Sequence, residues 1–304
     1  NICVFFRYGG DFMVSDILKY LPEEVAEEVK ICGNEIEEIR FRVNKKVCLK
    51  MGQDIKFLNT TINKNDIKTT FERMCENSVY SYINQVSNGF ITIDGGNRVG
   101  LVGNCVIENG KVININYISS LNFRIAREIK DVAIPFLKEV IDIKNNTIFT
   151  TLIVSPPGGG KTTVLRDLIR IISNGMPEIG FKAKTCGVVD ERGEIAASYK
   201  GIPQNDLGEL TDVIENVPKD IGMRILIRSM APEIIACDEI GTQEDYNAIK
   251  YAVNSGVKGI FTYHAKNIDE VMRNEKIKEL ANDNVIEKII VLDMEKKGQI
   301  KEVR

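Results

Sequence analysis

The chain has 304 residues, of which 43% are apolar and 27% are charged; this length suits two domains, and this composition excludes a disordered or fibrous protein. Its 40 Lys and Arg residues nearly balance its 43 Asp and Glu residues, which gives a formal net charge of −3. That balance disfavours a dedicated nucleic-acid-binding protein, although a local basic patch is compatible with it. The seven cysteines are scattered without C-x-x-C spacing, and no run of 18 apolar residues occurs, so we expect no disulfide framework, zinc site or membrane span.

The first half of the chain has the pattern of a small α+β domain. Apolar residues recur at helical spacing over 11–30, with an interruption near Pro22. Farther on, short alternating runs are punctuated by Gly and Asn, which is typical of an antiparallel meander. We expect strands at 36–43, 46–51, 89–96, 98–106, 112–117 and 121–127, and helices at 66–76 and after Pro135. The polar stretch 59–68 predicts a turn.

From Ile148 onward the pattern changes to strands that alternate with helices. We expect strands at 148–154, 186–190, 234–238, 257–263 and 286–293, and helices at 161–174, 219–229 and 242–254. These strands are apolar on both faces, which indicates a parallel sheet covered by helices. We therefore predict an N-terminal α+β domain over residues 1–145 and an α/β domain over residues 146–304.

The strongest chemical signal is a phosphate-binding loop, Ser155-Pro-Pro-Gly-Gly-Gly-Lys-Thr-Thr163, between an expected strand and an expected helix. Successive glycines allow backbone N–H groups to surround phosphate oxygens, and the helix N-terminus adds positive partial charge. The expected nucleotide-binding residues are Pro157, Gly158, Gly159, Gly160, Lys161, Thr162 and Thr163. The usual pattern has Gly at position 155, where this chain has Ser; serine fits there unless the position requires a positive φ.

A second signal is the apolar run 234–237 followed by Asp238 and Glu239. Two adjacent carboxylates at a strand end can point in different directions and so divide the chemistry between them. We expect Asp238, together with the hydroxyl of Thr162, to bind Mg²⁺, and Glu239 to polarise an attacking water. Alone, this pattern is more often a solvated strand end, but the phosphate-binding loop 77 residues earlier favours the functional interpretation.

Two further strand ends carry polar residues. Asp190 and Glu191 begin an acidic cluster in the segment 188–194, and Glu191 is an alternative to Glu239 as the base, while a surface turn with an internal ion pair is the structural alternative. His264, the single histidine, follows the expected strand 257–263. One histidine cannot form a metal site, but it can sense a γ-phosphate.

The positions of the arginines determine whether such a site is complete within one chain. Arg124 and Arg127 end the expected first domain, and Arg224 and Arg228 share one face of an expected helix. Any of them is a candidate arginine finger toward the nucleotide of a neighbouring subunit, with a solvated face or a salt bridge as the alternative.

The segment Asn63-Lys-Asn-Asp66 matches the N-K-x-D guanine-recognition pattern. It precedes the phosphate-binding loop, whereas the motif of small GTPases follows it. We therefore reject guanine recognition.

Taken together, these motifs resemble the stage III sporulation protein AA family, relatives of the type II and type IV secretion ATPases. The resemblance covers about residues 15–295. Besides the phosphate-binding loop and the Thr262/His264 pair, it rests on the segments 38–42, 89–100, 124–127, 189–192, 227–232 and 238–241. It implies a RecA-like P-loop ATPase core with a preceding smaller domain. By the same resemblance, residues 190–191 are similar to the acidic box of those ATPases, and His264 is similar to their histidine box.

The resemblance also implies a function. We expect an ATPase that uses ATP and Mg²⁺ and assembles as a homo-oligomeric, hexameric ring. Its place would be the cytoplasmic face of a membrane in the mother cell during endospore formation, where it would drive a secretion-like channel. Its partners would be membrane-channel proteins of the sporulation machinery, with no stable nucleic acid partner. Two alternatives remain: a nucleotide-binding assembly protein with little hydrolysis, and a nucleic-acid-dependent RecA-like ATPase.

Overall fold

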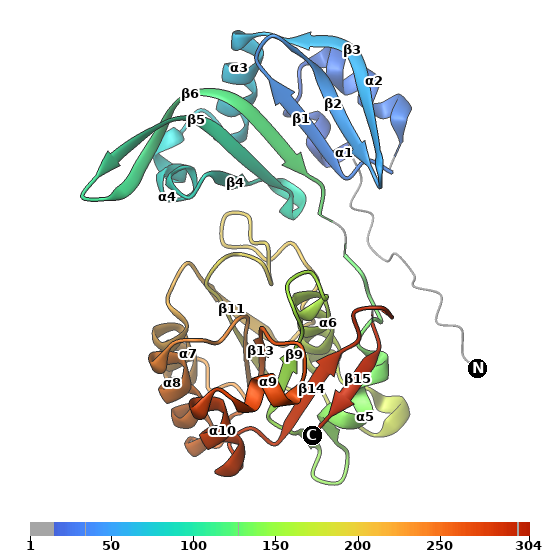
Figure 1. Ribbon diagram of the computed structural model, residues 1–304, viewed down its shortest axis with the longest axis vertical. Helices are drawn as coiled ribbons and strands as arrows, with labels where there is room; N and C mark the ends of the chain where they lie inside the picture. The colour runs from blue at the N-terminus through green and yellow to red at the C-terminus, as the bar shows by residue number, and fades with distance from the viewer. Residues whose placement is uncertain (1–14, 34, 127, 297) are drawn as a thin grey trace. The chain divides into compact units, whose positions relative to one another are not determined.

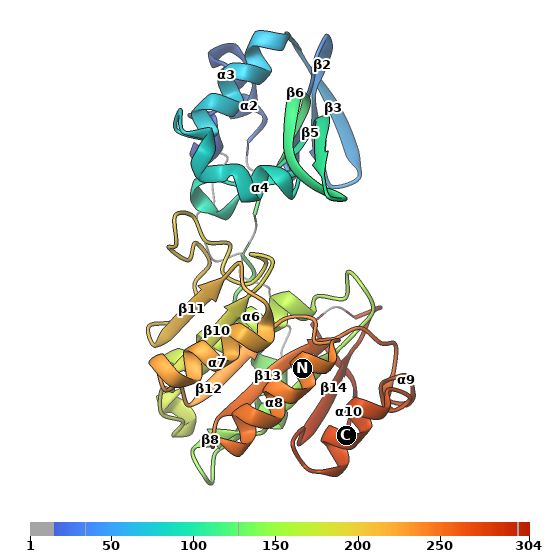
Figure 2. The same ribbon diagram turned by 90° about the vertical axis from the view of Figure 1, so that its left-hand side faces the viewer.

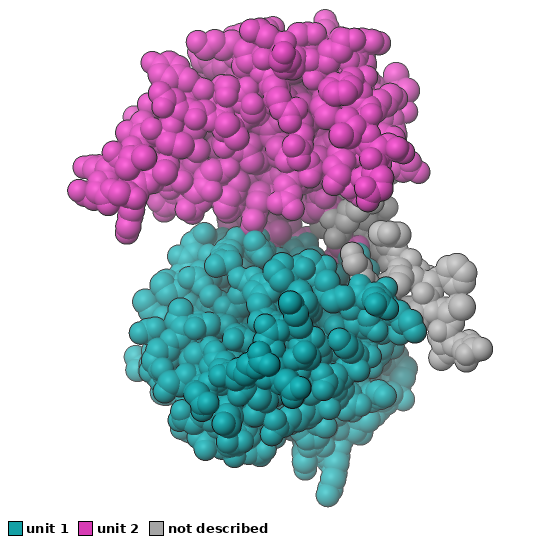
Figure 3. Space-filling view, in the orientation of Figure 1, with its two compact units in different colours: residues 1–9, 129–196, 205–304 teal, residues 10–128, 197–204 magenta. Residues whose placement is uncertain are grey.

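The computed structural model describes residues 15–33, 35–126, 128–296 and 298–304. Their contacts form two compact units, coloured separately in Figure 3. Unit 1 contains Ile129–Ala196 and Asn205–Arg304, and unit 2 contains the described residues up to Glu128 together with Ala197–Gln204. That residues 1–145 and 146–304 form two separate domains stays a prediction.

Unit 2 is built on a six-stranded antiparallel sheet with the order β3-β2-β1-β6-β5-β4 (Figure 1). Its strands are β1 (Glu38–Arg42), β2 (Lys45–Met51), β3 (Asp54–Ile62), β4 (Phe90–Thr92), β5 (Arg98–Glu108) and β6 (Lys111–Arg124). Its helices are α1 (Ser15–Leu18), α2 (Glu23–Cys32), α3 (Lys64–Met74) and α4 (Ile83–Ser87). The antiparallel strands were expected, but the end of β3 and the start of α3 occupy the expected turn 59–68, and β6 is one long strand where two short ones were expected.

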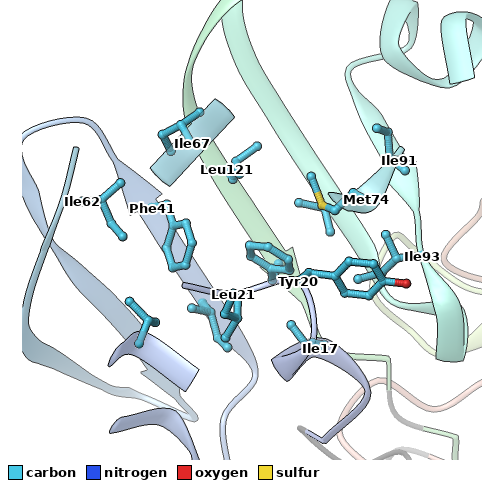
Figure 4. Packing of buried hydrophobic residues seen from close by; sticks show 14 of the residues in the cluster. Ile17, Tyr20, Leu21, Phe41, Ile62, Ile67, Met74, Ile91, Ile93 and Leu121 are labelled. Atoms are coloured by element: carbon cyan, nitrogen blue, oxygen red, sulfur yellow. The ribbon is translucent and has the colours of Figure 1, made fainter. Parts of the chain in front are cut away.

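The core of unit 2 lies between the helices and one face of this sheet. Alternate residues of β1 and of the C-terminal end of β6 are buried, as the two-residue period of a strand requires. The rings of Phe41 and Phe123 meet edge to face with their centroids 5.5 Å apart. Figure 4 shows Tyr20, Leu21 and Met74 from the helical side packed beside these strands.

The segment Ala197–Gln204 belongs to unit 2 although its neighbours in sequence belong to unit 1. The Tyr199 hydroxyl donates to Glu76 at 2.5 Å, and the Lys200 ammonium pairs with the same carboxylate at 2.6 Å. The backbone N–H of Asn205 donates to the carbonyl of residue 196 at 3.1 Å, so the two ends of the segment lie side by side. The segment is therefore a compact loop anchored at its tip by one carboxylate.

Unit 1 contains a seven-stranded sheet with the order β11-β10-β12-β13-β9-β14-β15, in which only β15 is antiparallel to its neighbour. Figure 2 shows β11, β10, β12, β13 and β14 of this sheet, and Figure 1 shows β9 and β15. Its strands are β9 (Thr151–Val154), β10 (Cys186–Asp190), β11 (Thr211–Glu215), β12 (Ile234–Cys237), β13 (Lys258–Tyr263), β14 (Lys288–Leu292) and β15 (Ile300–Val303). A short pair, β7 (Ile141–Asp142) and β8 (Thr147–Ile148), lies outside this sheet. The helices are α5 (Leu137–Val140), α6 (Lys161–Asn174), α7 (Lys219–Ser229), α8 (Gln243–Asn254), α9 (Ile268–Met272) and α10 (Glu275–Asn282).

Helices cover both faces of this sheet. Ile153 of β9 packs in the cluster that contains Leu165 and Leu168 of α6, whereas its neighbours Leu152 and Val154 pack in the cluster formed by α7, α8 and α10. Because both faces are buried, the central strands β9, β10, β12, β13 and β14 are mostly apolar, which explains why the sequence predicted a parallel sheet correctly. Within the described ranges, every helix is too short or too polar to cross a lipid bilayer.

We expect Glu76→Ala to release the loop 197–204, because both tip contacts end on that carboxylate. Exposed ion pairs contribute up to about 1 kcal/mol, so trypsin should cleave after Lys200 about two- to fivefold faster. Limited proteolysis followed by mass spectrometry measures this. Glu72→Ala, which removes a half-exposed carboxylate of α3, is the control and should leave the cleavage rate unchanged. Equal rates in both variants would show that Glu76 does not anchor the loop.

Candidate active site

The expected functional residues of unit 1 gather at one edge of its sheet. β10, β12, β13 and β9 are consecutive parallel neighbours, so their carboxyl ends lie side by side. The acidic cluster follows β10, Asp238 and Glu239 follow β12, His264 follows β13, and the phosphate-binding loop follows β9. Ligands of open α/β sheets bind beyond the carboxyl ends of the strands, which makes this edge the candidate active site.

The loop after β9 has the geometry of a phosphate cradle. Gly158 and Gly160 have φ values of 75° and 87°, in the left-handed region that glycine tolerates. α6 begins at Lys161, and Gly160 at its N-cap has no side chain to cap it. The backbone N–H groups of the first turn, which includes Thr162 and Thr163, are therefore suited to an anionic group.

Ser155 fits the loop without strain. It is fully buried and lies outside the group of described residues with positive φ, and its Oγ donates to the Pro156 carbonyl at 2.9 Å. A Cβ added to Gly159 would lie 2.3 Å from this Oγ. The serine is thus accommodated because position 159 has no side chain.

Lys161 is almost completely buried beneath this loop. Its ammonium donates to the carbonyls of Ser155 and Pro156 at 3.0 and 3.3 Å and to Nδ1 of His264 at 2.9 Å. Burial lowers the pKa of Lys161 below its ordinary value, and the negative charges of Asp238 and Glu239 oppose that shift. Since the ammonium has only donors, Nδ1 of the imidazole accepts and Nε2 carries the ring proton.

Asp238 is held by two threonines. The Thr162 hydroxyl donates to its Oδ2 at 2.6 Å, and the hydroxyl of Thr262, which is fully buried, donates to its Oδ1. Thr262 also accepts the backbone N–H of Glu239 at 2.8 Å. Thr262 therefore fixes the backbone at the point where the two acidic residues diverge.

Thr162 and Asp238 fit a magnesium ion. The part of the chain that the structure describes has no cluster of three or more His, Cys, Asp or Glu side chains suited to a metal. Mg²⁺ does not require one, because it usually takes one or two protein oxygens and completes its shell with phosphate oxygens and water. The 2.6 Å contact between the Thr162 hydroxyl and the Asp238 carboxylate brings two such oxygens together at the start of α6.

Glu239 adopts a left-handed backbone with φ 49°, uncommon for a residue other than glycine. Its carboxylate accepts from Nη1 of Arg192 at 2.6 Å and from Nε2 of His264. Partial burial by itself raises the pKa of Glu239. The hydrogen bond from His264 and the charges of Arg192 and Lys161 lower this pKa by a larger amount, so it lies below its ordinary value. The side chain is therefore kept ionised, as an acceptor for a water proton must be.

The acidic residues after β10 have other partners. Asp190 is 2% exposed and accepts the backbone N–H groups of residues 194–196 at 2.8, 3.0 and 2.8 Å. Glu191 pairs with Lys219 at the start of α7. Among the described contacts, Glu239 rather than Glu191 is hydrogen-bonded to His264, which in turn contacts Lys161.

The candidate arginine fingers lie in different parts of the chain. Arg124 is exposed at the end of β6 in unit 2, and Arg127 lies outside the described residues. In unit 1 the guanidinium of Arg224 lies 4.9 Å from the centroid of the Tyr251 ring, a cation–π contact, and Arg228 is exposed at the end of α7. Arg224 thus has a packing partner within its own unit.

The rejected guanine pattern has a local structural explanation. The Asn63 side chain accepts the N–H groups of Asn65 and Asp66, and the Asp66 side chain accepts the N–H of Asn63. This is the capping box at the start of α3.

Sequence reasoning did not single out Arg192 or Lys219, and it quoted Thr262 only as part of the family resemblance. Each contacts a functional carboxylate that is distant in sequence. The available signal was an arginine directly after two acidic residues at a strand end, which predicts an ion pair without naming its partner.

A groove of about 540 Å³ lies in unit 2 between α3 and β6. Phe71, Ile115 and Tyr117 line it, together with Lys64 and Lys68. None of the expected nucleotide-binding residues lines this groove. Cavity size therefore does not locate the candidate active site.

Comparison with known proteins identifies the family. Residues 13–304 match the family described as sporulation stage III, protein AA. The chain belongs to this family. It is 36% identical over 288 residues to the stage III sporulation protein AA of Bacillus subtilis (strain 168), a match that covers 93% of this chain and 92% of that protein.

Two solved structures show the fold. The ATPase DotB of Legionella pneumophila is 12% identical with a TM-score of 0.55, covering 88% of this chain and 74% of that one. The pilus retraction motor PilT, solved with bound ADP, is 16% identical with a TM-score of 0.58, covering 88% and 76%. The expected RecA-like core with a preceding smaller α+β part is confirmed. The chain is therefore a member of a sporulation protein family, and it shares its fold with DotB and PilT.

We expect Gly159→Ala to lower the free energy of unfolding by about 1–3 kcal/mol, because its Cβ would overlap Ser155. Ser155→Gly in the same chain removes two of the three overlapping atoms; the third, Sδ of Met294 at 2.8 Å, belongs to a flexible side chain that can shift, so most of that loss should be restored. Thermal unfolding measures both. Gly241→Ala, whose new Cβ would have no atom within 4 Å, is the control. A Gly159→Ala variant as stable as this control would contradict the assigned packing.

Proposed function

We propose that this chain is an ATP-hydrolysing motor subunit of a secretion-like channel in endospore formation, acting as a hexameric ring at the cytoplasmic, mother-cell face of a membrane. The observation that carries the proposal is the continuous contact chain at the carboxyl edge of the unit 1 sheet. It runs from Lys161 through His264 to Glu239, and Thr162 and Asp238 pair beside it. Family membership supports the sporulation role, and the fold shared with an ATPase and a pilus retraction motor supports the motor role.

The roles of the residues follow from their contacts. The backbone N–H groups of Gly158, Gly159 and Gly160 and the first turn of α6 bind the phosphates, and Lys161 supplies a positive charge to them. Thr162 and Asp238 hold Mg²⁺, which neutralises phosphate charge when it is bound. Glu239 orients and polarises the attacking water, and His264 links that carboxylate to the lysine.

The assembly and the partners complete the proposal. An arginine from a neighbouring subunit, Arg124 or Arg127, supplies positive charge to the nucleotide. Membrane-channel proteins of the sporulation machinery are the proposed partners, and no stable nucleic acid partner is proposed. The second candidate function is a nucleotide-binding assembly protein with little hydrolysis. It would need Lys161 and Asp238 as a motor does, so measured turnover separates the two.

We expect Lys161→Ala to weaken Mg·ATP binding about 10- to 100-fold, because a charge-assisted hydrogen bond contributes about 1.5–3 kcal/mol. Titration with a fluorescent ATP analogue measures the affinity. The fold should remain stable, since the variant removes a buried charge. Lys182→Ala, an exposed lysine of the same unit, is the control. Unchanged affinity in Lys161→Ala would contradict the phosphate-binding assignment.

We expect Glu239→Gln to retain Mg·ATP binding and to lower the rate of hydrolysis at least ~10²-fold, because the amide cannot accept a proton. Phosphate release measured beside nucleotide binding separates the two effects. Glu191→Gln is the matched variant and should have a much smaller effect. The opposite ranking would transfer the role of base to Glu191.

We expect activity to require assembly, because an arginine supplied by a neighbouring subunit contributes ~10³–10⁵ in rate. Turnover per subunit should fall steeply on dilution, and Arg124→Ala or Arg127→Ala should lower it without weakening nucleotide binding much. Mixing Lys161→Ala with either arginine variant should restore part of the activity. Constant turnover on dilution, with no recovery in the mixture, would exclude a shared site.

A further inference from the structure

The turn after β10 is fixed at both ends. The buried carboxylate of Asp190 accepts three backbone N–H bonds from residues 194–196. From the other side, Arg166 of α6 donates to the carbonyl oxygens of residues 194 and 195, both at 3.0 Å. The turn is therefore tied to its own strand and to the helix that begins at the phosphate-binding loop. Arg192 extends from this turn.

Arg192 contacts the proposed base directly. Its Nη1 donates to Oε2 of Glu239 at 2.6 Å, while Oε1 accepts from Nε2 of His264. Each carboxylate oxygen has two lone pairs, so both oxygens can be held and still accept a hydrogen bond from a water. The Glu239 carboxylate is thus oriented from two directions, by two residues on different strand ends.

We propose that Arg192 is a positioning residue of this site, which acts from within the same chain by fixing the Glu239 carboxylate; this inference rests on the proposed ATPase function. Without the guanidinium, the side chain of Glu239 regains rotamers that His264 alone does not exclude. A carboxylate displaced by about 1 Å costs about 10²-fold in rate when it must align a water. The arginine therefore acts through Glu239, and no contact between Arg192 and phosphate is required.

If the ion pair between Arg192 and Glu239 served only to stabilise the fold, its removal would affect stability rather than turnover. The side chain of Arg192 is 65% exposed and that of Glu239 is 32% exposed, and exposed pairs contribute little to folding. Removing Arg192 should therefore shift the melting temperature by no more than about 4 °C. A large effect on turnover with so small an effect on stability is the result that distinguishes positioning from simple packing.

The first experiment compares Arg192→Ala, Arg192→Lys and the control Arg273→Ala, which removes an exposed arginine at the end of α9. Arg192→Ala should lower the maximal rate of ATP hydrolysis about 10- to 100-fold and change the affinity for Mg·ATP less than about threefold. Arg192→Lys should recover part of the rate, because the ammonium restores the charge without the planar fork. A maximal rate within error of the control, or an affinity that falls in parallel with the rate, would overturn the inference.

The second experiment combines Arg192→Ala with Glu239→Gln. If Arg192 acts through Glu239, the double variant should turn over at the rate of Glu239→Gln alone. Multiplication of the two effects would mean that the guanidinium acts independently of the base, and this would overturn the positioning role.

The third experiment needs no nucleotide. The chain has one histidine, so imidazole ¹⁵N NMR of the intact protein reports on His264 without overlap. Arg192→Ala should shift or broaden the Nε2 signal, because the carboxylate that it contacts is no longer held, and Arg273→Ala should not. Identical His264 signals in the wild type and Arg192→Ala would overturn the inference.

The failure of this inference is distinguishable from failure of the proposed function. Turnover that depends on Lys161 but is unaffected by Arg192→Ala overturns this inference alone. If the wild type has no ATP turnover that Lys161→Ala abolishes, both this inference and the proposed function are overturned.

Discussion

Parallel pairing of β10, β12, β13 and β9 is the constraint on which the candidate active site depends. Val189 lies opposite Cys237, Cys237 opposite Phe261, and Val154 opposite Tyr263. These registers bring the ends of the four strands to within two residues of one another, so segments separated by up to about a hundred residues place their polar side chains together. The sheet can hold this register because helices bury both of its faces, which excludes water from the ladder of hydrogen bonds.

The second feature of the site is that each carboxylate has its own partners. Asp190 satisfies backbone N–H groups, Glu191 pairs with Lys219, Asp238 binds two threonine hydroxyls, and Glu239 binds Arg192 and His264. Four acidic side chains can therefore lie close to a site for an anionic ligand, because hydrogen bonds and cations compensate their repulsion. Such pairing also gives chemically similar groups different tasks, since the partners of each carboxylate set its orientation.

Where the elements were predicted well, the local pattern was strong. The bounds of α6, α7 and β10 match the expectation because long apolar faces, or continuous apolar runs, lie between clear turn residues. β11 and β15 were missed because they are only partly buried and contain polar residues, and pairing with a neighbouring strand is what makes them extended. β3 was missed for a similar reason: six of its nine residues are exposed. Ser155 was an open question because backbone conformation and the space beside Gly159 are tertiary properties.

By itself the sequence determined the parallel α/β core, the phosphate-binding loop and the acidic and histidine residues at the strand ends, because these are local patterns governed by hydrophobic period and glycine content. Only the tertiary structure decided which side chains meet. Arg192 and Glu239 are 47 residues apart and His264 and Lys161 are 103 apart, and strand order and register, not spacing, bring them into contact. The loop 197–204 is anchored to Glu76, more than a hundred residues away, for the same reason. A contact between distant side chains depends on the packing of every element between them, and no local pattern encodes that.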